Sequence, residues 1–196
     1  MLKSRPQEMT ADEFLIWNLS QDEKYELVDG FPVPLHAQSG ATQRHDVVVV
    51  NLIRRLANRL VGKPCRPTTS DQAVRTAIKR VRRPDVTIEC APMVPTSLEA
   101  REPVVVFEVL SPSNRPSQIV RKIEEYQRHP GIRHVVLIEQ AEVSVTRLTR
   151  EGTGVWSETT LTDLSDTLAL EPPGVTLPLA EIYEGVTLSD DPPMPA

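Results

Sequence analysis

The chain has 196 residues, 39% of them hydrophobic and 25% charged, which fits a globular protein and excludes a collagen-like or wholly disordered chain. No apolar run approaches the roughly 20 residues that cross a bilayer, so we expect no membrane contact. The net charge of −5 disfavours nucleic-acid binding, but eleven basic and only two acidic residues lie between Arg44 and Arg83. This segment could attract phosphate. An exposed helix face followed by a solvated hairpin would give the same count.

The N-terminal third is predicted to contain two helices and one hairpin. A capping-box pattern, TADE, predicts a short helix over Thr10–Ser20. Two short strands around a DG turn are predicted over Lys24–Val33. From His45 to Leu60, apolar side chains recur on one helical face, which predicts a helix, although the four consecutive valines in this segment would equally suit a strand.

The rest of the chain is predicted to alternate extended segments with one further helix. Val104–Leu110 is almost wholly apolar, which is typical of a central strand buried on both faces. A helix is predicted over Ser117–Arg128, with Ile119, Ile123 and Tyr126 as its apolar stripe. Other extended segments are predicted over Thr68–Thr76, Val81–Glu89, Val135–Ile138, Val143–Arg147 and Val155–Leu161. We expect one α/β domain over residues 1–188 and a disordered tail over residues 189–196, which lack apolar content.

The two cysteines, Cys65 and Cys90, have neither CxxC nor histidine-partnered spacing. We interpret both as reduced structural thiols. The first residues contain acids and lack the apolar core of a secretory signal, so a cytoplasmic location is the default expectation.

Two carboxylates are the first candidates for chemistry. An ionisable residue inside a buried strand is costly unless it is paired or binds a metal, and Glu108 has that position. Asp85 opens a predicted strand, so it would lie beside Glu108 if the two strands pair. Such oxygen ligands suit Mg²⁺ or Mn²⁺, and a bound metal could polarise a phosphoryl oxygen and activate a water. Alternatively, Asp85 is a turn residue and Glu108 pairs with Arg82 or Arg83.

Three further residues could complete this site. Lys122 lies at the edge of the helical stripe, from which its ammonium could reach the carboxylates and stabilise transition-state charge. Glu26 could complete the metal shell, and His45 could orient a phosphate or a water. A solvated flank for Lys122 and a satisfied helix-start histidine for His45 are the structural alternatives. Tyr126 is expected in the core rather than in the catalytic set.

The order of these motifs resembles the family of Uma-type "putative restriction endonucleases" in the PD-(D/E)XK nuclease superfamily. The matching motifs are YELVDG, RHDVVVVNLIRRL, RPDV and VFEVLSPSN, followed by a lysine and a tyrosine on the next helix, and the resemblance spans Met9–Glu184. It implies a restriction-endonuclease-like three-layer α/β fold, with a central mixed β-sheet flanked by α-helices. It also implies metal-dependent hydrolysis of DNA phosphodiester bonds.

The resemblance assigns roles to particular residues. It implies Asp85 and Glu108 as metal ligands, while Glu26 and His45 match the upstream acidic and histidine positions of the family. We include Glu26 as a candidate third ligand.

The chain departs from the family pattern at two places. The lysine that usually stands two residues after the acidic residue would fall at Leu110, so its role would pass to Lys122. Family members commonly have Asp four residues before this lysine, where the chain has Gln118. This difference affects helix capping or site geometry but removes no primary ligand.

The leading hypothesis is a Mg²⁺- or Mn²⁺-dependent endonuclease in which Asp85 and Glu108 hold the metal and Lys122 assists. One rival is a catalytically inactive DNA-binding protein on the same scaffold, using the Arg44–Arg83 segment. Another is an α/β interaction protein in which Glu108 is merely paired. The expected partner is DNA, with no nucleotide cofactor. A homodimer is expected from double-strand cutting and from the family resemblance.

Overall fold

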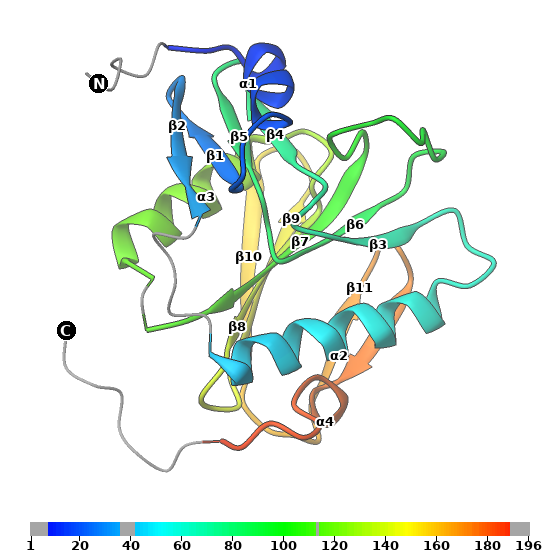
Figure 1. Ribbon diagram of the computed structural model, residues 1–196. Coiled ribbons are helices and arrows are strands. Elements are labelled where there is room, and N and C mark those ends of the chain that lie inside the picture. The colour runs from blue at the N-terminus through cyan, green and yellow to red at the C-terminus, as the bar shows by residue number, and fades with distance from the viewer. Residues whose placement is uncertain (1–7, 36–41, 113, 189–196) are drawn as a thin grey trace.

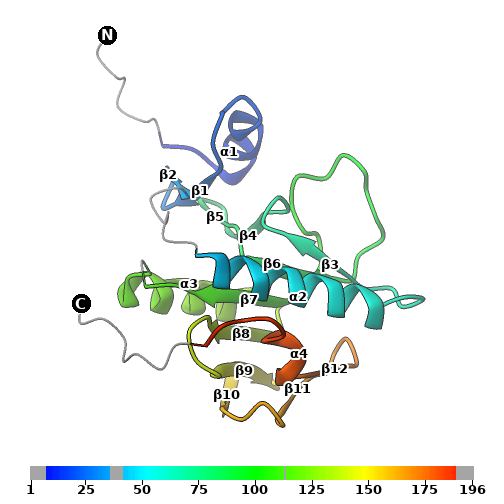
Figure 2. The same ribbon diagram turned by 60° about the horizontal axis from the view of Figure 1, so that its bottom comes forward.

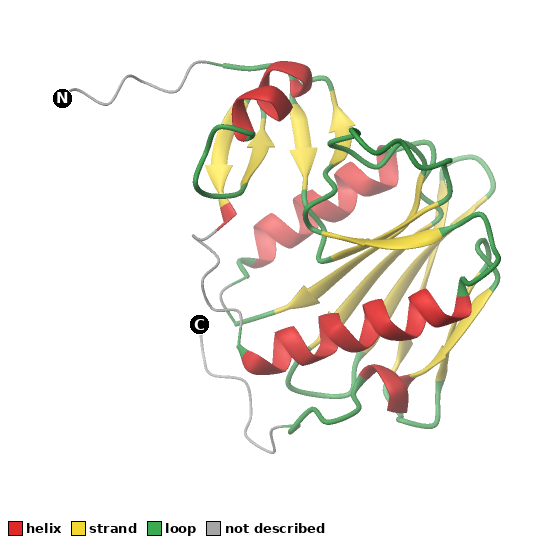
Figure 3. Cartoon of the chain, turned by 45° about the vertical axis from the view of Figure 1, so that its right-hand side comes forward, coloured by secondary structure: helices red, strands yellow, loops and turns green. Residues whose placement is uncertain are grey.

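The computed structural model describes residues 8–35, 42–112 and 114–188 and is built on a six-stranded mixed sheet (Figure 1). The strand order is β10-β9-β8-β7-β6-β3, in which β7 and β8 are parallel and the other neighbours are antiparallel. Its strands are β3 (Arg66–Thr69), β6 (Val86–Glu89), β7 (Pro103–Leu110), β8 (His134–Glu139), β9 (Val145–Glu151) and β10 (Val155–Leu161). Helices α2 (Gln43–Arg59) and α3 (Pro116–Arg128) cover opposite faces of this sheet (Figure 3). The predicted α/β fold with a central mixed sheet is confirmed.

Strand β7 shows how the two faces are divided. Successive side chains of a strand point to opposite faces of its sheet. Val105 and Phe107 are buried in the cluster that contains α2, whereas Val106 packs with Tyr126 of α3. The strand is therefore buried on both faces, as its apolar sequence predicts. Glu108, two residues after Val106, falls on the α3 face.

A second, smaller sheet of order β2-β1-β5-β4 lies beside the main sheet and carries α1 (Figures 1 and 2). Its elements are α1 (Ala11–Asn18), β1 (Tyr25–Val28), β2 (Phe31–Pro34), β4 (Val74–Ala77) and β5 (Arg80–Arg82). Phe14 of α1 packs against Leu27 of β1 and Val81 of β5. The neighbouring residues Glu26 and Arg82 therefore point away from α1, and both bond to side chains of α3.

The local predictions for the N-terminal third are confirmed. Thr10 caps α1 in a complete capping box. Asp29 and Gly30 have φ values of 49° and 86° in the turn between β1 and β2. The valine-rich segment is helical in α2, because Val48 and Leu52 lie on its buried face, and the alternative of a strand is wrong.

Two segments predicted as continuous are each divided between the sheets. Thr68–Thr76 contributes to β3 in the main sheet and to β4 in the small sheet. Val81–Glu89 likewise contributes to β5 and β6. Arg83 links the two points at which the chain passes from one sheet to the other. Its guanidinium donates to the carbonyl oxygens of Ser70 and Asp71 at 2.9 Å each. Backbone partners of this kind leave no signature in the sequence.

The C-terminal part contains elements that the sequence did not predict. Strands β11 (Thr167–Leu170) and β12 (Val175–Pro178) form a hairpin, and α4 (Leu179–Ile182) follows. They bury Leu168 and Leu177 in the cluster that contains α2. Elements of four residues are too short for a clear periodicity. The predicted tail, residues 189–196, lies outside the described residues. None of the helices described is long and apolar enough to cross a membrane.

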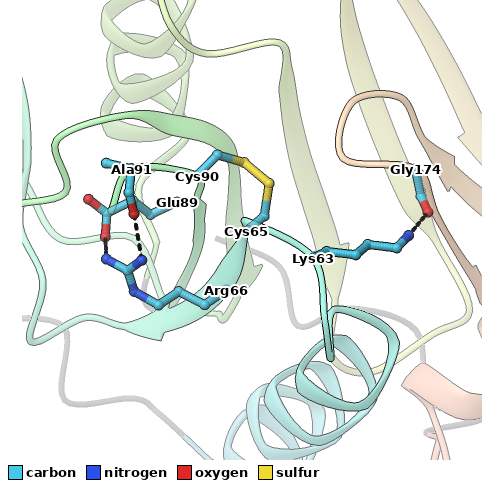
Figure 4. Close-up of a disulfide and its surroundings, with 7 residues drawn as sticks. All are labelled: Lys63, Cys65, Arg66, Glu89, Cys90, Ala91 and Gly174. Atoms are coloured by element: carbon cyan, nitrogen blue, oxygen red, sulfur yellow. Dashed lines mark hydrogen bonds and ion pairs between the residues drawn. A yellow bond between two sulfur atoms is a disulfide. The ribbon is translucent and has the colours of Figure 1, made fainter. Parts of the chain in front are cut away.

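Cys65 and Cys90 form a disulfide, so the prediction of two reduced thiols is wrong (Figure 4). Arg66 and Glu89 face each other in the antiparallel pair of β3 and β6. Cys65 precedes Arg66 and Cys90 follows Glu89, so the two cysteines also lie opposite each other. Arg66 also forms a 2.5 Å ion pair with Glu89 (Figure 4). The bridge depends on the register of two strands, which the 25-residue separation of the cysteines does not reveal.

Removing the disulfide is expected to lower the free energy of unfolding by about 3 kcal/mol, because a cross-link restricts the unfolded chain. Urea unfolding of the oxidised wild type and of the Cys65→Ser/Cys90→Ser double variant measures the difference. Wild type in excess dithiothreitol should unfold near the midpoint of the variant. Equal midpoints for oxidised wild type and variant would contradict the expectation.

Candidate active site

Asp85 and Glu108 lie opposite each other on adjacent strands. Val86 faces Phe107 in the antiparallel register of β6 and β7, so the residue before β6 falls opposite Glu108. The Oδ2 atom of Asp85 accepts a 2.8 Å hydrogen bond from the backbone N–H of Val109. This bond fixes the Asp85 carboxylate against β7, and the predicted pairing of the two strands is confirmed.

Glu108 is buried, with 6% of its surface exposed, and bonds to side chains of α3. The Nζ atom of Lys122 lies 3.1 Å from Oε1 and 3.0 Å from Oε2, and the Tyr126 hydroxyl donates to Oε1 at 2.6 Å. Burial raises the pKa of Glu108 above its ordinary value; Lys122 opposes this shift, and the negative charges of Asp85 and Glu26 add to it. The alternative pairing of Glu108 with Arg82 or Arg83 is wrong, because both arginines bond elsewhere.

Lys122 extends from α3 and bridges two carboxylates. Besides Glu108, its Nζ atom lies 3.3 Å from Oε1 of Glu26. Burial alone would lower the pKa of Lys122, but Glu108 and Glu26 raise it above the ordinary value. The side chain is therefore held as a buried ammonium ion, and the alternative of a solvated flank does not hold.

Glu26, on β1, is surrounded by hydrogen-bond donors. Its Oε2 atom accepts from Arg82 at 2.9 Å, and its Oε1 atom accepts from the backbone N–H of Arg83 at 3.1 Å. Burial alone would raise the pKa of Glu26, but the charges of Lys122 and Arg82 hold it below the ordinary value. Arg82 in turn makes two 2.7 Å hydrogen bonds to Glu125 of α3. The structure therefore joins Glu26 to the site through Lys122.

His45 reaches the site from the first turn of α2. The helix begins at Gln43, and the side chain of the preceding Thr42 caps it by accepting from the backbone N–H of His45. The Nε2 atom of His45 lies 3.4 Å from Oδ1 of Asp85. Burial lowers the pKa of His45, but the hydrogen bond and charge of Asp85 outweigh burial and raise it above the ordinary value. The charged imidazolium is thus favoured beside this carboxylate.

The structure brings all five predicted site residues into one connected cluster. His45 contacts Asp85, Asp85 lies opposite Glu108, and Lys122 joins Glu108 to Glu26. Over residues 8–35, 42–112 and 114–188, no three or more His, Cys, Asp and Glu side chains are grouped so that they could hold a metal ion. The oxygen donors on adjacent strands are the two carboxylates of Asp85 and Glu108.

Sequence reasoning missed two buried polar groups of α3. The ring of Tyr126 lies in the core as predicted, but its hydroxyl bonds to Glu108. Glu125 is also buried and binds Arg82. Glu125 and Tyr126 follow Lys122 by three and four residues, a spacing that places each of them on the helical face of Lys122. That spacing of polar groups was the signal available in the sequence.

The basic segment Arg44–Arg83 is largely neutralised by intramolecular ion pairs. Eight of its eleven basic residues pair with carboxylates: Arg54, Arg55, Arg59, Arg66, Arg75, Lys79, Arg80 and Arg82. Three of the four arginines of α2, namely Arg54, Arg55 and Arg59, bind Glu181 and Glu184, in and just after α4. The segment therefore offers far less free charge to phosphates than its sequence indicates, which weakens the DNA-binding rival that depends on it.

Comparisons with known proteins agree with this fold. A family model, Uma2, described as "Putative restriction endonuclease", matches residues 11–180. The uncharacterised Synechocystis protein slr1290 is 28% identical over 180 residues, which cover 91% of this chain and 93% of that protein. The crystal structure of a "putative nuclease belonging to DUF820" from Anabaena variabilis has a TM-score of 0.70 at 14% identity, covering 91% of this chain and 99% of that one, and so has the same fold. Because the family model spans most of its length, the chain belongs to the Uma2 family.

Proposed function

We propose that the protein is a metal-dependent endonuclease that hydrolyses phosphodiester bonds of DNA. The observation that carries this proposal is the pair of carboxylates, Asp85 and Glu108, on adjacent strands with the ammonium of Lys122 bonded to Glu108. Membership of a family described as "Putative restriction endonuclease" supports the reaction class. The fold shared with a structure described as a "putative nuclease" is consistent with it.

The donors of the site fit a hard divalent cation such as Mg²⁺ or Mn²⁺. Burial and the negative charges of Asp85 and Glu26 raise the pKa of Glu108 against the opposing effect of Lys122, and a cation held between Asp85 and Glu108 would favour the charged form of Glu108. Asp85 and Glu108 would hold the ion, with the remaining ligands supplied by water and phosphate oxygens. Such an ion would polarise a phosphoryl oxygen and acidify the attacking water.

The side chains of the protein have separate tasks in this proposal. Lys122 stabilises the extra negative charge of the phosphate in the transition state, because its ammonium is buried where the local dielectric is low. Tyr126 and the N–H of Val109 fix the two carboxylates. His45, at the edge of the cluster, orients the phosphate or a water.

A plasmid-nicking assay tests the proposed function. Wild type should nick DNA with Mg²⁺ or Mn²⁺ and lose activity in chelator, and Glu108→Gln should be inactive with either metal. Glutamine keeps an acceptor for Lys122 and Tyr126 but removes the charge that binds the cation. Glu142→Gln, at an exposed carboxylate on the surface, is the matched control and should retain activity. A folded wild type that nicks no DNA with either metal would contradict the proposal.

A further inference from the structure

A chain of buried ion pairs connects the small sheet to the active site. It runs from Glu125 through Arg82, Glu26 and Lys122 to Glu108. The nitrogen–oxygen distances along it are 2.7, 2.9, 3.3 and 3.0 Å, and the five side chains are between 1% and 8% exposed. The small sheet supplies Arg82 and Glu26, the main sheet supplies Glu108, and α3 supplies the remaining two.

Arg82 is the central link of this chain. Its planar guanidinium donates to Glu125 through two nitrogens and to Glu26 through a third, an arrangement that the point charge of a lysine cannot reproduce. Buried ion pairs are costly to desolvate, and apolar side chains of similar size often stabilise a fold equally well. Simple docking of the two sheets would therefore not require this chain of charges.

The position of Lys122 depends on a balance between two carboxylates. Its ammonium lies at nearly equal distances from Glu26 and Glu108. Because Arg82 neutralises one side of Glu26, only part of the Glu26 charge acts on the ammonium. Without Arg82, the whole charge of Glu26 would draw Lys122 away from Glu108.

We propose that Arg82 is a positioning residue, which by pairing with Glu26 keeps the Lys122 ammonium available to Glu108 and the scissile phosphate. Glu26 is then the anchor of Lys122 and not a third metal ligand. The catalytic part of this inference rests on the proposed nuclease function, whereas the placement of the ammonium does not.

The test compares Arg82→Met with wild type in two measurements. The first is the NMR resonance of the Lys122 side-chain ammonium in metal-free, ¹⁵N-lysine-labelled protein, which is assigned by its absence from Lys122→Arg; the chain has only five lysines. We expect this resonance to shift or broaden. The second is nicking kinetics, in which kcat should fall roughly 10- to 100-fold, while KM and the Mg²⁺ Kd measured by calorimetry stay within about twofold of wild type.

Two further variants make the test decisive. Arg75→Met removes a cation of β4, in the same small sheet, whose ion pairs are with Asp12 and Glu99 outside this chain of ion pairs, and should leave both measurements at the wild-type level. Arg82→Lys keeps the buried charge and replaces Arg82→Met in the test if that variant does not fold. We expect the Lys122 resonance and kcat to change in the same direction as in Arg82→Met, but by less.

The outcomes for the two claims are separable. An unchanged Lys122 resonance in a folded Arg82→Met or, where that variant does not fold, in Arg82→Lys overturns the positioning role. If wild type nicks no DNA, the proposed function fails, but the resonance comparison still decides whether Arg82 places the ammonium. A Mg²⁺ Kd weakened in Glu26→Gln as strongly as in Asp85→Asn overturns the assignment of Glu26 as an anchor.

Discussion

Asp85→Asn is expected to abolish Mg²⁺ binding and to reduce DNA nicking by about 1,000-fold. Several kcal/mol of transition-state stabilisation would depend on the metal, and each 1.4 kcal/mol corresponds to a factor of ten in rate. Asparagine still offers an oxygen to the N–H of Val109, so the strand pairing should persist. Calorimetric titration with Mg²⁺ and plasmid nicking on the same preparations measure the two effects.

The control for this substitution is Asp22→Asn, which removes an exposed carboxylate from the loop after α1. It should bind Mg²⁺ and nick DNA as wild type does. Wild-type Mg²⁺ affinity in a folded Asp85→Asn variant would show that Asp85 is not a ligand, and the proposed metal site would have to be abandoned.

Lys122→Met is expected to lower the free energy of unfolding by roughly 3–5 kcal/mol, the usual cost of removing one partner from a buried ion pair. Glu108 would keep only the hydroxyl of Tyr126 as a hydrogen-bond donor among its described side-chain contacts. Glu26 would still be paired with Arg82. Urea unfolding in chelator measures the loss. Lys79→Met is the control: it breaks an ion pair with Glu8 in which both side chains are 51% exposed, and should cost less than about 1 kcal/mol.

The destabilisation caused by Lys122→Met should depend on pH. The pKa of Glu108 is already raised by burial, and loss of the ammonium that opposes this shift would raise it further. The folded variant would then bind a proton more readily than the unfolded chain, so its stability should increase as pH falls from 7 to 5. Unfolding at both pH values, with wild type in parallel, tests this sign. A variant that loses further stability relative to wild type at pH 5 would contradict the expectation.

The sequence predicted the centre of the site because the relevant signals are local. An apolar run that contains one glutamate indicates a buried carboxylate, and a proline–aspartate step indicates a strand start. The sequence therefore predicts that Asp85 and Glu108 lie side by side if their strands pair. The helical spacing of α3 likewise placed Lys122 near the sheet. Each of these inferences depends on residues within one element and on a single strand pairing.

The parts that could not be predicted depend on contacts between distant segments. The disulfide follows from the register of β3 and β6, and the ion pairs of Arg54, Arg55 and Arg59 follow from the position of α4 and the residues just after it, which have almost no sequence signal. The hydroxyl of Tyr126 was missed because an aromatic residue in an apolar stripe is normally core. Its polar role depends on Glu108, which is close only in the folded chain.

The two edge strands of the main sheet, β3 and β10, differ in how readily another strand could pair with them. The border at β3 has only four residues, contains Pro67, which has no N–H to donate, and is cross-linked beside Arg66. Short length and proline are features that discourage strand addition from another molecule. The opposite border is β10, seven residues long and without proline. Addition of a further strand to this sheet, whether from a second copy or during aggregation, is therefore favoured at β10 over β3.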